Sequence, residues 1–597
     1  MRARAFLPLL LAACTPLPPP LPPAPAAAPQ VVSGPPAAAL EHYALAILAW
    51  DDGDLDAAAT EIGQALLFDP KAAALHATRG RIALDRGDPA EAARALTVAW
   101  TLDPDDLSIQ VDRARAYAEA GEREKARVAY RLCLGQGRSD AAFGGLIRLL
   151  QQDGESWEAH RLMTRWREAA LDDPLWLRAR AELCLELGLD EEAWEDFAAL
   201  VERWPPQPPA LQGLFAANDR TGHHRRTLEL LERVAHATPG DEHVLELLAS
   251  LAARVGDFER AVPAWEQVDR LEGGQNPFTR LFLAKARLSM GAPGEALTLL
   301  DTPDAAAASP TQVAEIRARA LLALGQEAEA LAALDEQYPA GTGRLQARAR
   351  LFEEADRLAE ARDALRAASL DETGWYQRWD LATLEARTGA LDRALALIAD
   401  NADQDDQGQA LAAARLHALA GDLAGAVRLA GEAEAQHRDD PAIAAARARW
   451  LNDAGDTAGA LAALRAAAAR DLVSPDLARQ HAALAWEAGA ADEARQVLED
   501  ALTVFSDDAS LQNDLAWLRV EHGEHGPEVL ALAWRAVDQE PANAAFLDTL
   551  GWVLLQRGQV AEALPELEHA ARLDPDNDVI AAHLRAARQA ASAGETR

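Results

Sequence analysis

Glycine recurs along this chain at a nearly constant interval, and that interval constrains the fold more than any other feature. Most steps between these glycines are 34 residues, and the positions are Gly53, Gly87, Gly121, Gly154, Gly188, Gly222, Gly256, Gly291 and Gly325, then Gly389, Gly421, Gly455, Gly489, Gly523 and Gly558. Proline keeps the same interval between Pro70 and Pro104 and between Pro541 and Pro575. A fixed period of this length is typical of repeat arrays, which bury a continuous core by stacking one unit on the next.

Each interval is typical of two helices joined by a turn. Glycine readily adopts the left-handed conformation that ends a helix, and alanine stands five residues after most of these glycines, where a small side chain lets two helices approach closely. Proline then marks the end of many second helices, because it cannot continue them. The composition agrees, since 49% of the residues are hydrophobic but only 5% are aromatic. The sequence therefore predicts an all-α chain.

The stretch FLDTLGWVLLQRGQVAEALPELEHAARLDP shows the repeat unit most clearly. Its signature positions match the tetratricopeptide repeat, through Leu550, Gly551, Gly558, Ala563, Leu567, Ala570 and Pro575. The chain resembles that family through about sixteen units in register. The resemblance implies a right-handed α-solenoid of helix-turn-helix units, whose first helices line a concave groove, and a role in protein binding.

The regularity of the spacing divides the chain into segments. We expect a regular array over 37–271, a less regular array over 272–408, a second regular array over 409–577, and a capping helix with a tail over 578–597. In the less regular part Asp356 replaces the turn glycine, and EGGQN, TPDAAAASP and NADQDDQG stand as insertions; earlier, Thr227 replaces the recurring alanine. Weaker interfaces between neighbouring units predict that 272–408 opens first.

The N-terminal residues are predicted to be a targeting signal rather than part of the fold. Arg2 and Arg4 precede a short apolar run that ends in Leu11-Ala12-Ala13-Cys14. This order is typical of a secretory signal, and it resembles the bacterial lipobox, in which the cysteine is lipidated after cleavage. We expect residues 1–13 to be the signal peptide, Cys14 to be lipidated, and residues 14–36, rich in proline, to be an extended tether. In the resembled lipoproteins, a residue other than aspartate after the cysteine favours the outer membrane, and here it is Thr15.

The sequence contains no motif for catalysis or phosphate binding, so we expect no enzyme activity, no cofactor and no metal site. The turn EHGEHG at 521–526 clusters two histidines with two acids, and His223 and His224 occupy an equivalent turn. We interpret both as turns exposed to solvent rather than as metal sites. Cys133 and Cys184 stand at packing positions and are expected to be buried without a disulfide.

The groove is therefore the place to look for a binding site. One position after the small signature residue of each first helix, eight units carry a cation: Arg81, Arg115, Arg148, Lys285, Arg319, Arg350, Arg415 and Arg449. Only Glu182 is acidic at this position, and the last two units carry Trp517 and Trp552 there, with Asn513 and Asp548 one turn earlier. Either these cations, the arginine column, bind acidic ligands, or they only balance nearby acids; the tryptophans either form an aromatic patch or pack against the capping helix.

The charge of the chain narrows its partners. A formal net charge of −37 argues against nucleic-acid binding. We expect a non-enzymatic scaffold, lipid-anchored on the periplasmic face of the outer membrane, that binds envelope proteins or peptides and supports assembly of an envelope or secretion machine. The alternative is binding of an anionic polysaccharide during exopolysaccharide secretion. Salt-sensitive binding of a glycan by the purified protein would distinguish the two, because generic repeats do not name the partner.

Overall fold

The computed structural model describes residues 36–136, 139–165, 173–301, 309–338, 341–368, 375–399 and 406–595. The chain divides into two compact units, residues 1–168 and 169–597. The signal peptide, Cys14 and nearly all of the tether lie outside the described residues, as do residues 302–308 and 401–405 of two insertions.

The described residues of the first unit form four helical hairpins. Its helices are α1 (Ala37–Asp51), α2 (Leu55–Phe68), α3 (Ala73–Asp85), α4 (Pro89–Leu102), α5 (Leu107–Glu119), α6 (Arg123–Gln136), α7 (Asp140–Gln152) and α8 (Ser156–Arg165). Each helix packs against the next one along the chain, as expected for a stacked array.

The described residues of the second unit continue the same pattern through twelve hairpins and one further helix. Its helices are α10 (Pro174–Leu187), α11 (Asp190–Arg203), α12 (Pro208–Thr221), α13 (His224–Ala237), α14 (Glu242–Arg254), α15 (Phe258–Leu271), α16 (Pro277–Ser289), α17 (Pro293–Leu300), α19 (Pro310–Ala323), α20 (Glu327–Gln337), α21 (Thr342–Glu354), α22 (Leu358–Arg366), α23 (Trp375–Arg387), α24 (Leu391–Ile398), α25 (Asp406–Leu419), α26 (Leu423–Gln436), α27 (Pro441–Asp453), α28 (Thr457–Ala468), α29 (Pro475–Glu487), α30 (Ala491–Val504), α31 (Ala509–Glu521), α32 (Pro527–Gln539), α33 (Ala544–Gln556), α34 (Val560–Leu573) and α35 (Asp578–Glu595).

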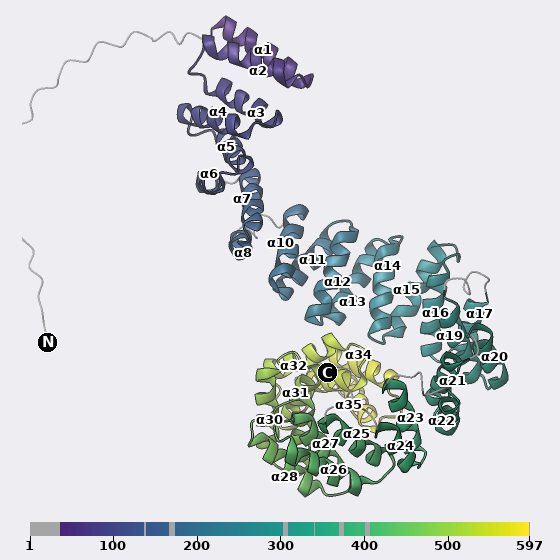
Figure 1. Cartoon of the computed structure of the whole chain (residues 1–597). Helices are drawn as coiled ribbons and strands as arrows, with labels where there is room; N and C mark the ends of the chain where they lie inside the picture. The colour runs from purple at the N-terminus through teal and green to yellow at the C-terminus, as the bar shows by residue number, and fades with distance from the viewer. Residues whose placement is uncertain are drawn as a thin grey trace, which may run out of the picture. The chain divides into compact units, whose positions relative to one another are not determined.

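This architecture confirms the predicted α-solenoid. The described helices form sixteen successive pairs, followed by α35, and the described residues contain no strand. Figure 1 shows the pairs of the second unit following one another along a curved path, with α35 against the last pair. Among the described helices, none is long and apolar enough to cross a membrane.

Turn chemistry explains where the first helix of each pair ends. All fifteen turn glycines have φ between 70° and 86°, the left-handed region that side chains with a Cβ disfavour. In the sixteenth pair Asp356 takes the same conformation, with φ of 55°. The glycine spacing in the sequence thus marks a backbone requirement that each hairpin repeats.

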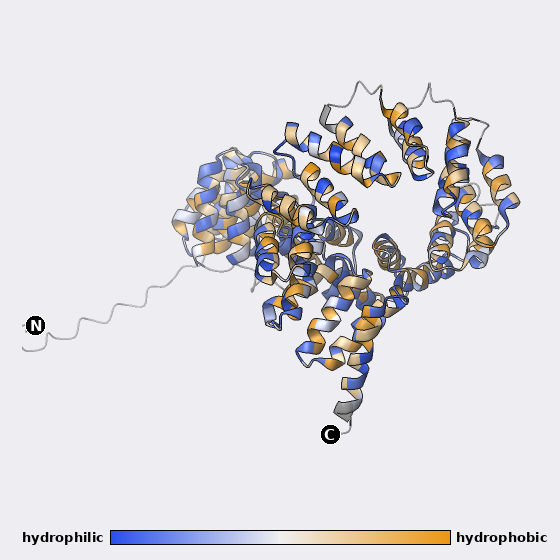
Figure 2. Ribbon diagram, turned by 90° about the horizontal axis from the view of Figure 1, so that it is seen from below, coloured by the Kyte–Doolittle hydropathy of each residue, from blue (hydrophilic) through white to orange (hydrophobic). Residues whose placement is uncertain are grey.

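The recurring alanine is the centre of each hairpin. Its side chain is completely buried at Ala58, Ala92, Ala126, Ala159, Ala193, Ala261, Ala296, Ala330, Ala394, Ala426, Ala460, Ala494 and Ala563. Thr227, which replaces alanine in one unit, is 1% exposed and accepts a hydrogen bond from the indole Nε1 of Trp194 at 2.8 Å. Figure 2 shows the result as helices that carry orange and blue residues along their length, the pattern of amphipathic helices.

The middle of the second unit has shorter second helices. Helices α17, α22 and α24 span eight, nine and eight residues, whereas α13, α15 and α34 each span fourteen. Each short helix buries only two side chains. The segment predicted to be less regular therefore contains hairpins with smaller interfaces.

The second unit curves until its last hairpins meet its early ones. Helix α32 packs against α13, although more than 300 residues separate them along the chain. Figure 1 shows α32 and α34 beside the row of helices that includes α13. We call this contact region, formed by α11 to α15 on one side and α32 to α34 on the other, the seam.

Candidate functional site

The first helices of the hairpins carry the whole predicted arginine column. Arg81, Arg115 and Arg148 lie on α3, α5 and α7 of the first unit, and the other five cations lie on α16, α19, α21, α25 and α27 of the second. None of the eight is buried. Figure 1 shows α25, α27 and α31 on the inner side of the curve, with α26, α28 and α30 outside them. The register read from the sequence thus places the column on the first helices, as expected.

Five of the eight cations form ion pairs with acids. Four of them reach an acid outside their own helix, and the nitrogen–oxygen distances are 2.5 Å for Arg81–Asp112, 2.6 Å for Arg319–Glu354, 3.4 Å for Arg350–Glu315 and 2.6 Å for Arg449–Asp476. Arg115 pairs with Glu119 on its own helix. Exposed pairs of this kind each contribute about 0–1 kcal/mol. Four of these arginines therefore connect neighbouring repeats, and Arg115 pairs within its own helix.

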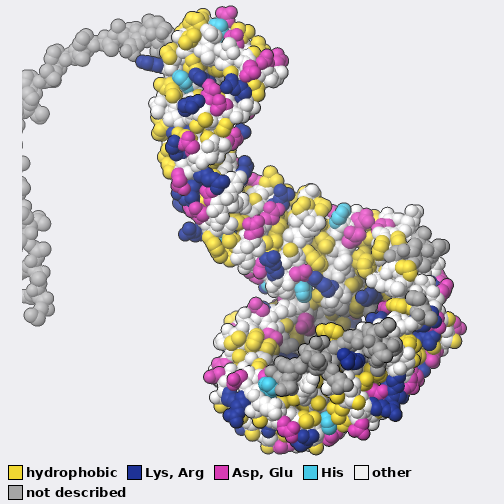
Figure 3. Space-filling model, viewed as in Figure 1, with side chains coloured by type: hydrophobic (Ala, Val, Ile, Leu, Met, Phe, Trp, Pro, Cys, Tyr) yellow, Lys and Arg dark blue, Asp and Glu magenta, His cyan; other side chains and the backbone are white. Residues whose placement is uncertain are grey.

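The other three cations of the column, Arg148, Lys285 and Arg415, have no ion pair with any described residue, and all three are exposed. An exposed guanidinium without a carboxylate partner keeps its donors available to a ligand. Figure 3 shows cations and acids interspersed over the visible surface of each unit.

One of the unpaired arginines lies in a cavity of about 690 Å³ on the first-helix surface. Arg415 of α25 and Arg449 of α27 both line it, so two members of the column share one cavity. Leu411, Leu419 and Trp450 supply apolar surface beside them. Such a cavity can take an apolar side chain while the guanidinium groups bind a neighbouring anionic group.

In the last unit, the terminal helix α35 covers the position that corresponds to the arginine column. The ring of Trp552 stacks on that of His583 of α35, with 4.1 Å between ring centroids, and its Nε1 donates to Glu521 at 2.8 Å. Asp548 is 7% exposed and its carboxylate lies 2.9 Å from Nδ1 of His583. Of the two interpretations offered above, packing against the terminal helix describes Trp552.

The neighbouring unit is less covered. Trp517 makes an edge-to-face contact with Trp486, with 5.5 Å between ring centroids. Asn513 is 7% exposed, and its amide donates to Asp514 at 3.3 Å. Trp517 thus retains partial exposure next to another indole, whereas Asn513 belongs to the buried helix interface.

The two histidine turns differ from each other. His522 and His525 are exposed, and the acids beside them bond to protein groups: Glu524 pairs with Arg495 at 3.2 Å. The expectation of a solvated turn is wrong for His223, which is only 13% exposed. Its ring nitrogens lie 2.6 Å from a carboxylate oxygen of Glu191 and 2.7 Å from one of Asp538, because the end of the array folds back onto this turn.

The cysteines have the expected surroundings. Cys133 on α6 and Cys184 on α10 are both buried and free of disulfides. Burial raises the pKa of Cys133 to about 11, so its thiol stays protonated and unreactive near neutral pH. Both cysteines therefore act as small core side chains.

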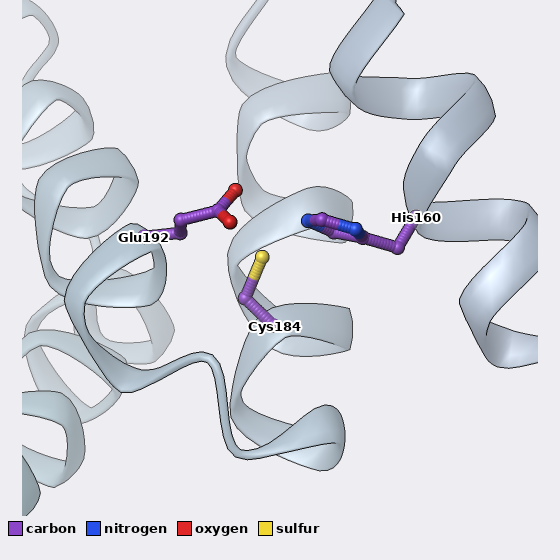
Figure 4. A group of neighbouring side chains, drawn as sticks. All are labelled: His160, Cys184 and Glu192. Atoms are coloured by element: carbon purple, nitrogen blue, oxygen red, sulfur yellow. The ribbon is translucent and has the colours of Figure 1, made fainter.

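A buried arginine, Arg180, stands four residues before Cys184 on the same helix, and it was not anticipated from the sequence. Arg180 of α10 is fully buried, 3.2 Å from the carboxylate of Asp196 and 2.7 Å from that of Glu192, both on α11. Figure 4 shows Cys184 on α10 and Glu192 on α11; the third side chain drawn there, His160, belongs to the other unit. The pair links the two helices of one hairpin.

Within the second unit, one group of acids has the composition of a cation site. The carboxylates of Glu242, Glu246 and Glu272 lie within 4.8 Å of one another, and burial, reinforced by the other two carboxylates, raises the pKa of Glu246. All three residues are at least partly exposed, Glu272 included although its Oε2 atom is buried, and no observation in the described part of the chain requires a bound ion there. We therefore assign no metal to it.

The chain was compared with protein families, curated proteins and solved structures. Residues 43–106 and 83–143 match family models described as tetratricopeptide repeat, so this part of the chain carries tetratricopeptide repeats. None of the curated proteins compared with the chain matches it significantly. Similar solved structures include Naa15/Naa10 bound to HypK-THB, at 15% identity over 94% of this chain and 97% of that chain, with a TM-score of 0.32. Another is the APC/C hetero-tetramer Cut9-Hcn1, at 13% identity over 85% of this chain and 95% of that chain, with a TM-score of 0.28.

Proposed function

We propose that this protein is a non-enzymatic scaffold that binds other proteins through the first-helix surface of its repeats. The observation that carries the proposal is the cavity shared by Arg415 and Arg449, where an unpaired guanidinium lies beside apolar side chains. Tetratricopeptide repeats generally bind proteins rather than catalyse reactions. The ligand that fits this surface is an acidic segment with at least one large apolar side chain.

We further propose that the scaffold belongs to a bacterial cell envelope. The support is the order of charge, apolar run and Leu11-Ala12-Ala13-Cys14, which resembles a lipobox, followed by Thr15. A lipid on Cys14 and the proline-rich residues 15–36 would tether the repeats to the periplasmic face of the outer membrane. In that place the scaffold would gather envelope proteins during assembly of an envelope or secretion machine.

The proposed lipid anchor on Cys14 is tested by replacing this residue with serine and fractionating the cells. We expect the C14S protein to leave the outer-membrane fraction, since a lipid anchor is the only membrane attachment proposed. Metabolic labelling with a fatty-acid analogue should mark the unmodified protein and spare the variant. Unchanged membrane association together with absence of label would contradict the anchor.

The binding surface is tested by replacing Arg415 and Arg449 with glutamine. A photo-crosslinking residue at Leu419, which lines the cavity, should form adducts with a partner in cells, and the double substitution should abolish them. The matched control is R428Q on α26, an arginine that is also exposed but lies on a second helix. Because a hydrogen bond to a charged group contributes about 1.5–3 kcal/mol, each lost arginine should weaken binding about tenfold or more. Equal adduct yields in the double variant and the control would contradict this surface.

A second candidate, binding of an anionic polysaccharide, is favoured by the three cations without carboxylate partners. Arg148, Lys285 and Arg415 would bind acidic sugars by charge, and the affinity would fall as salt rises. Purified protein titrated with a polyuronate and with its neutral counterpart distinguishes this function from protein binding. Equal binding of both glycans, or of neither, rules it out.

A further inference from the structure

The seam joins parts of the second unit that are far apart in sequence, and its contacts are mainly ionic. Arg225 of α13 binds Glu566 of α34 through two hydrogen bonds of 2.9 and 2.7 Å. In the reverse sense, Arg572 of α34 binds Glu259 of α15 through two hydrogen bonds of 3.0 and 3.2 Å. Paired hydrogen bonds of this geometry specify orientation as well as attraction.

The middle of the seam is a helix end capped from the other side. His223 precedes α13 and provides no side-chain cap for it. Asp538 of α32 instead accepts a hydrogen bond from the backbone N–H of Arg226 at 2.9 Å. A carboxylate at a helix N-terminus satisfies a free N–H group and interacts favourably with the helix dipole. The cap of α13 therefore exists only while the seam is closed.

Packing at this point is close. At Gly222, which has φ of 70°, an added Cβ would lie 2.8 Å from Cγ of Gln539. The guanidinium of Arg225 lies over the ring of Trp534, 4.7 Å from its centroid, and Arg225 and Glu566 are mostly buried. This is a formed interface rather than an approach of two surfaces through water.

His223 is the titratable group at the centre of these contacts. Its ring lies between Asp538 of α32 and Glu191 of α11, at 2.7 and 2.6 Å, and its edge faces the ring of Trp194. The cations near it are Arg226 of α13, which approaches its Nε2 to 3.3 Å, and Arg220 and Arg535, which line the same cavity of about 810 Å³. Asp190 lines that cavity as well, and His224 follows His223 on α13.

We propose that the seam is a pH-sensitive clasp, in which protonated His223 bridges Glu191 and Asp538 and holds the two ends of the second unit together. In the open state His223 loses Asp538, and the N–H of Arg226 loses its acceptor. The closed state therefore binds the proton more tightly than the open one. This inference does not depend on the binding surface around Arg415, which lies on other helices.

The direction of the pH dependence follows from linkage. Burial lowers the pKa of His223, but the hydrogen bonds and charges of Asp538 and Glu191 outweigh it, so the net pKa is raised above its usual 6.5. Closure is then strongest below the ordinary pKa and weakens as pH rises through the raised value. Burial lowers the pKa of His224 and of His569 on α34, the opposite direction to the shift of His223.

The amide of Arg226 offers a direct readout of the clasp. In hydrogen exchange on the full chain, we expect its protection factor, corrected for the intrinsic rate, to fall between pH 6 and pH 9. The fall should be about tenfold for each unit by which closure raises the pKa. H223Q should flatten this dependence, because glutamine does not titrate. H236Q, at an exposed position on the same helix, should leave it unchanged.

Folding is checked separately, through the protection of α19 and α20, which lie away from the seam and should not change. If H223Q also loses protection in α19 and α20, H223N takes its place. The pH dependence of the Arg226 protection factor in the unmodified protein is then also compared between low and high salt. A protection factor at Arg226 that is constant from pH 6 to pH 9 in the unmodified protein would overturn the proposal. So would a pH dependence in H223Q equal to that in H236Q.

Discussion

Asp356 occupies the turn position that the other fifteen hairpins give to glycine. Its φ of 55° lies in the left-handed region, and its side chain is almost fully exposed, 4.0 Å from Arg387. Aspartate tolerates this region better than most residues, but it still bears a cost that glycine avoids. Arg180 is the opposite kind of residue, a fully buried charge that depends on Asp196 and Glu192.

Replacing Asp356 with glycine should stabilise its hairpin by about 0.5–1 kcal/mol, because the left-handed strain disappears. Hydrogen exchange of the α21 and α22 amides measures this locally. D356N serves as the control, since asparagine also tolerates the conformation and should change little. Slower exchange in D356N than in D356G would mean that charge, not backbone strain, limits the hairpin.

Replacing Arg180 with alanine should destabilise the α10–α11 hairpin by about 3–5 kcal/mol, because the buried ion pair between Arg180 and Asp196 is broken. The matched control is R178A, two residues away on the same helix, whose exposed pair with Glu182 should contribute less than about 1 kcal/mol. Urea unfolding followed by hydrogen exchange in α10 and α11 gives both values. Similar losses in the two variants would show that the burial of Arg180 does not determine its contribution.

At the scale of the element, the length of the second helix varies from hairpin to hairpin, whereas the length of the first helix hardly changes in the second unit. The first helices of the second unit stay at thirteen or fourteen residues, but α17, α22 and α24 have only eight or nine. A shorter helix buries fewer side chains against its neighbours, so less apolar surface holds it in place. Local stability in a repeat array follows such nearest-neighbour interfaces.

The amides of α17, α22 and α24 should therefore exchange faster than those of α13, α15 and α34. A difference of two to four buried side chains corresponds to several kcal/mol of local opening free energy. Native-state hydrogen exchange with mass spectrometry measures all six helices in one experiment. Protection of 272–408 equal to that of the flanking segments would contradict the prediction.

At the scale of the whole molecule, the second unit is more than a row of neighbours. In an open solenoid each repeat contacts only the next, and opening at one end leaves the other unaffected. The seam adds contacts between α13 or α15 and α32 or α34. Stability of the early hairpins should then depend on residues more than 300 positions later.

Replacing Glu566 with glutamine tests this coupling. The substitution removes the charge from a mostly buried pair with Arg225, and about 1.5–3 kcal/mol of closure should be lost. Protection of α13 should fall about tenfold or more, while α19 and α20 stay unchanged. E568Q on the same helix, whose exposed partner is Arg588 of α35, should leave α13 unaffected. Equal protection of α13 in E566Q and in E568Q would show that the seam does not couple the two ends.

Periodicity by itself determined the helical hairpins, their number and the turn positions, because each depends on residues within one unit. Glycine at the turn and alanine at the centre are local requirements of backbone and packing, so they repeat visibly along the chain. The same register placed the cations on the first helices. Only the tertiary structure decided which cations have partners, since Arg319 pairs outside its helix and Arg415 does not.

The seam was beyond sequence reasoning for a further reason. Whether α32 reaches α13 depends on small rotations between hairpins that accumulate over the array, and no local pattern encodes their sum. In the sequence, His223 therefore looks like an ordinary turn residue. Only the tertiary structure shows that α32 places Asp538 against it.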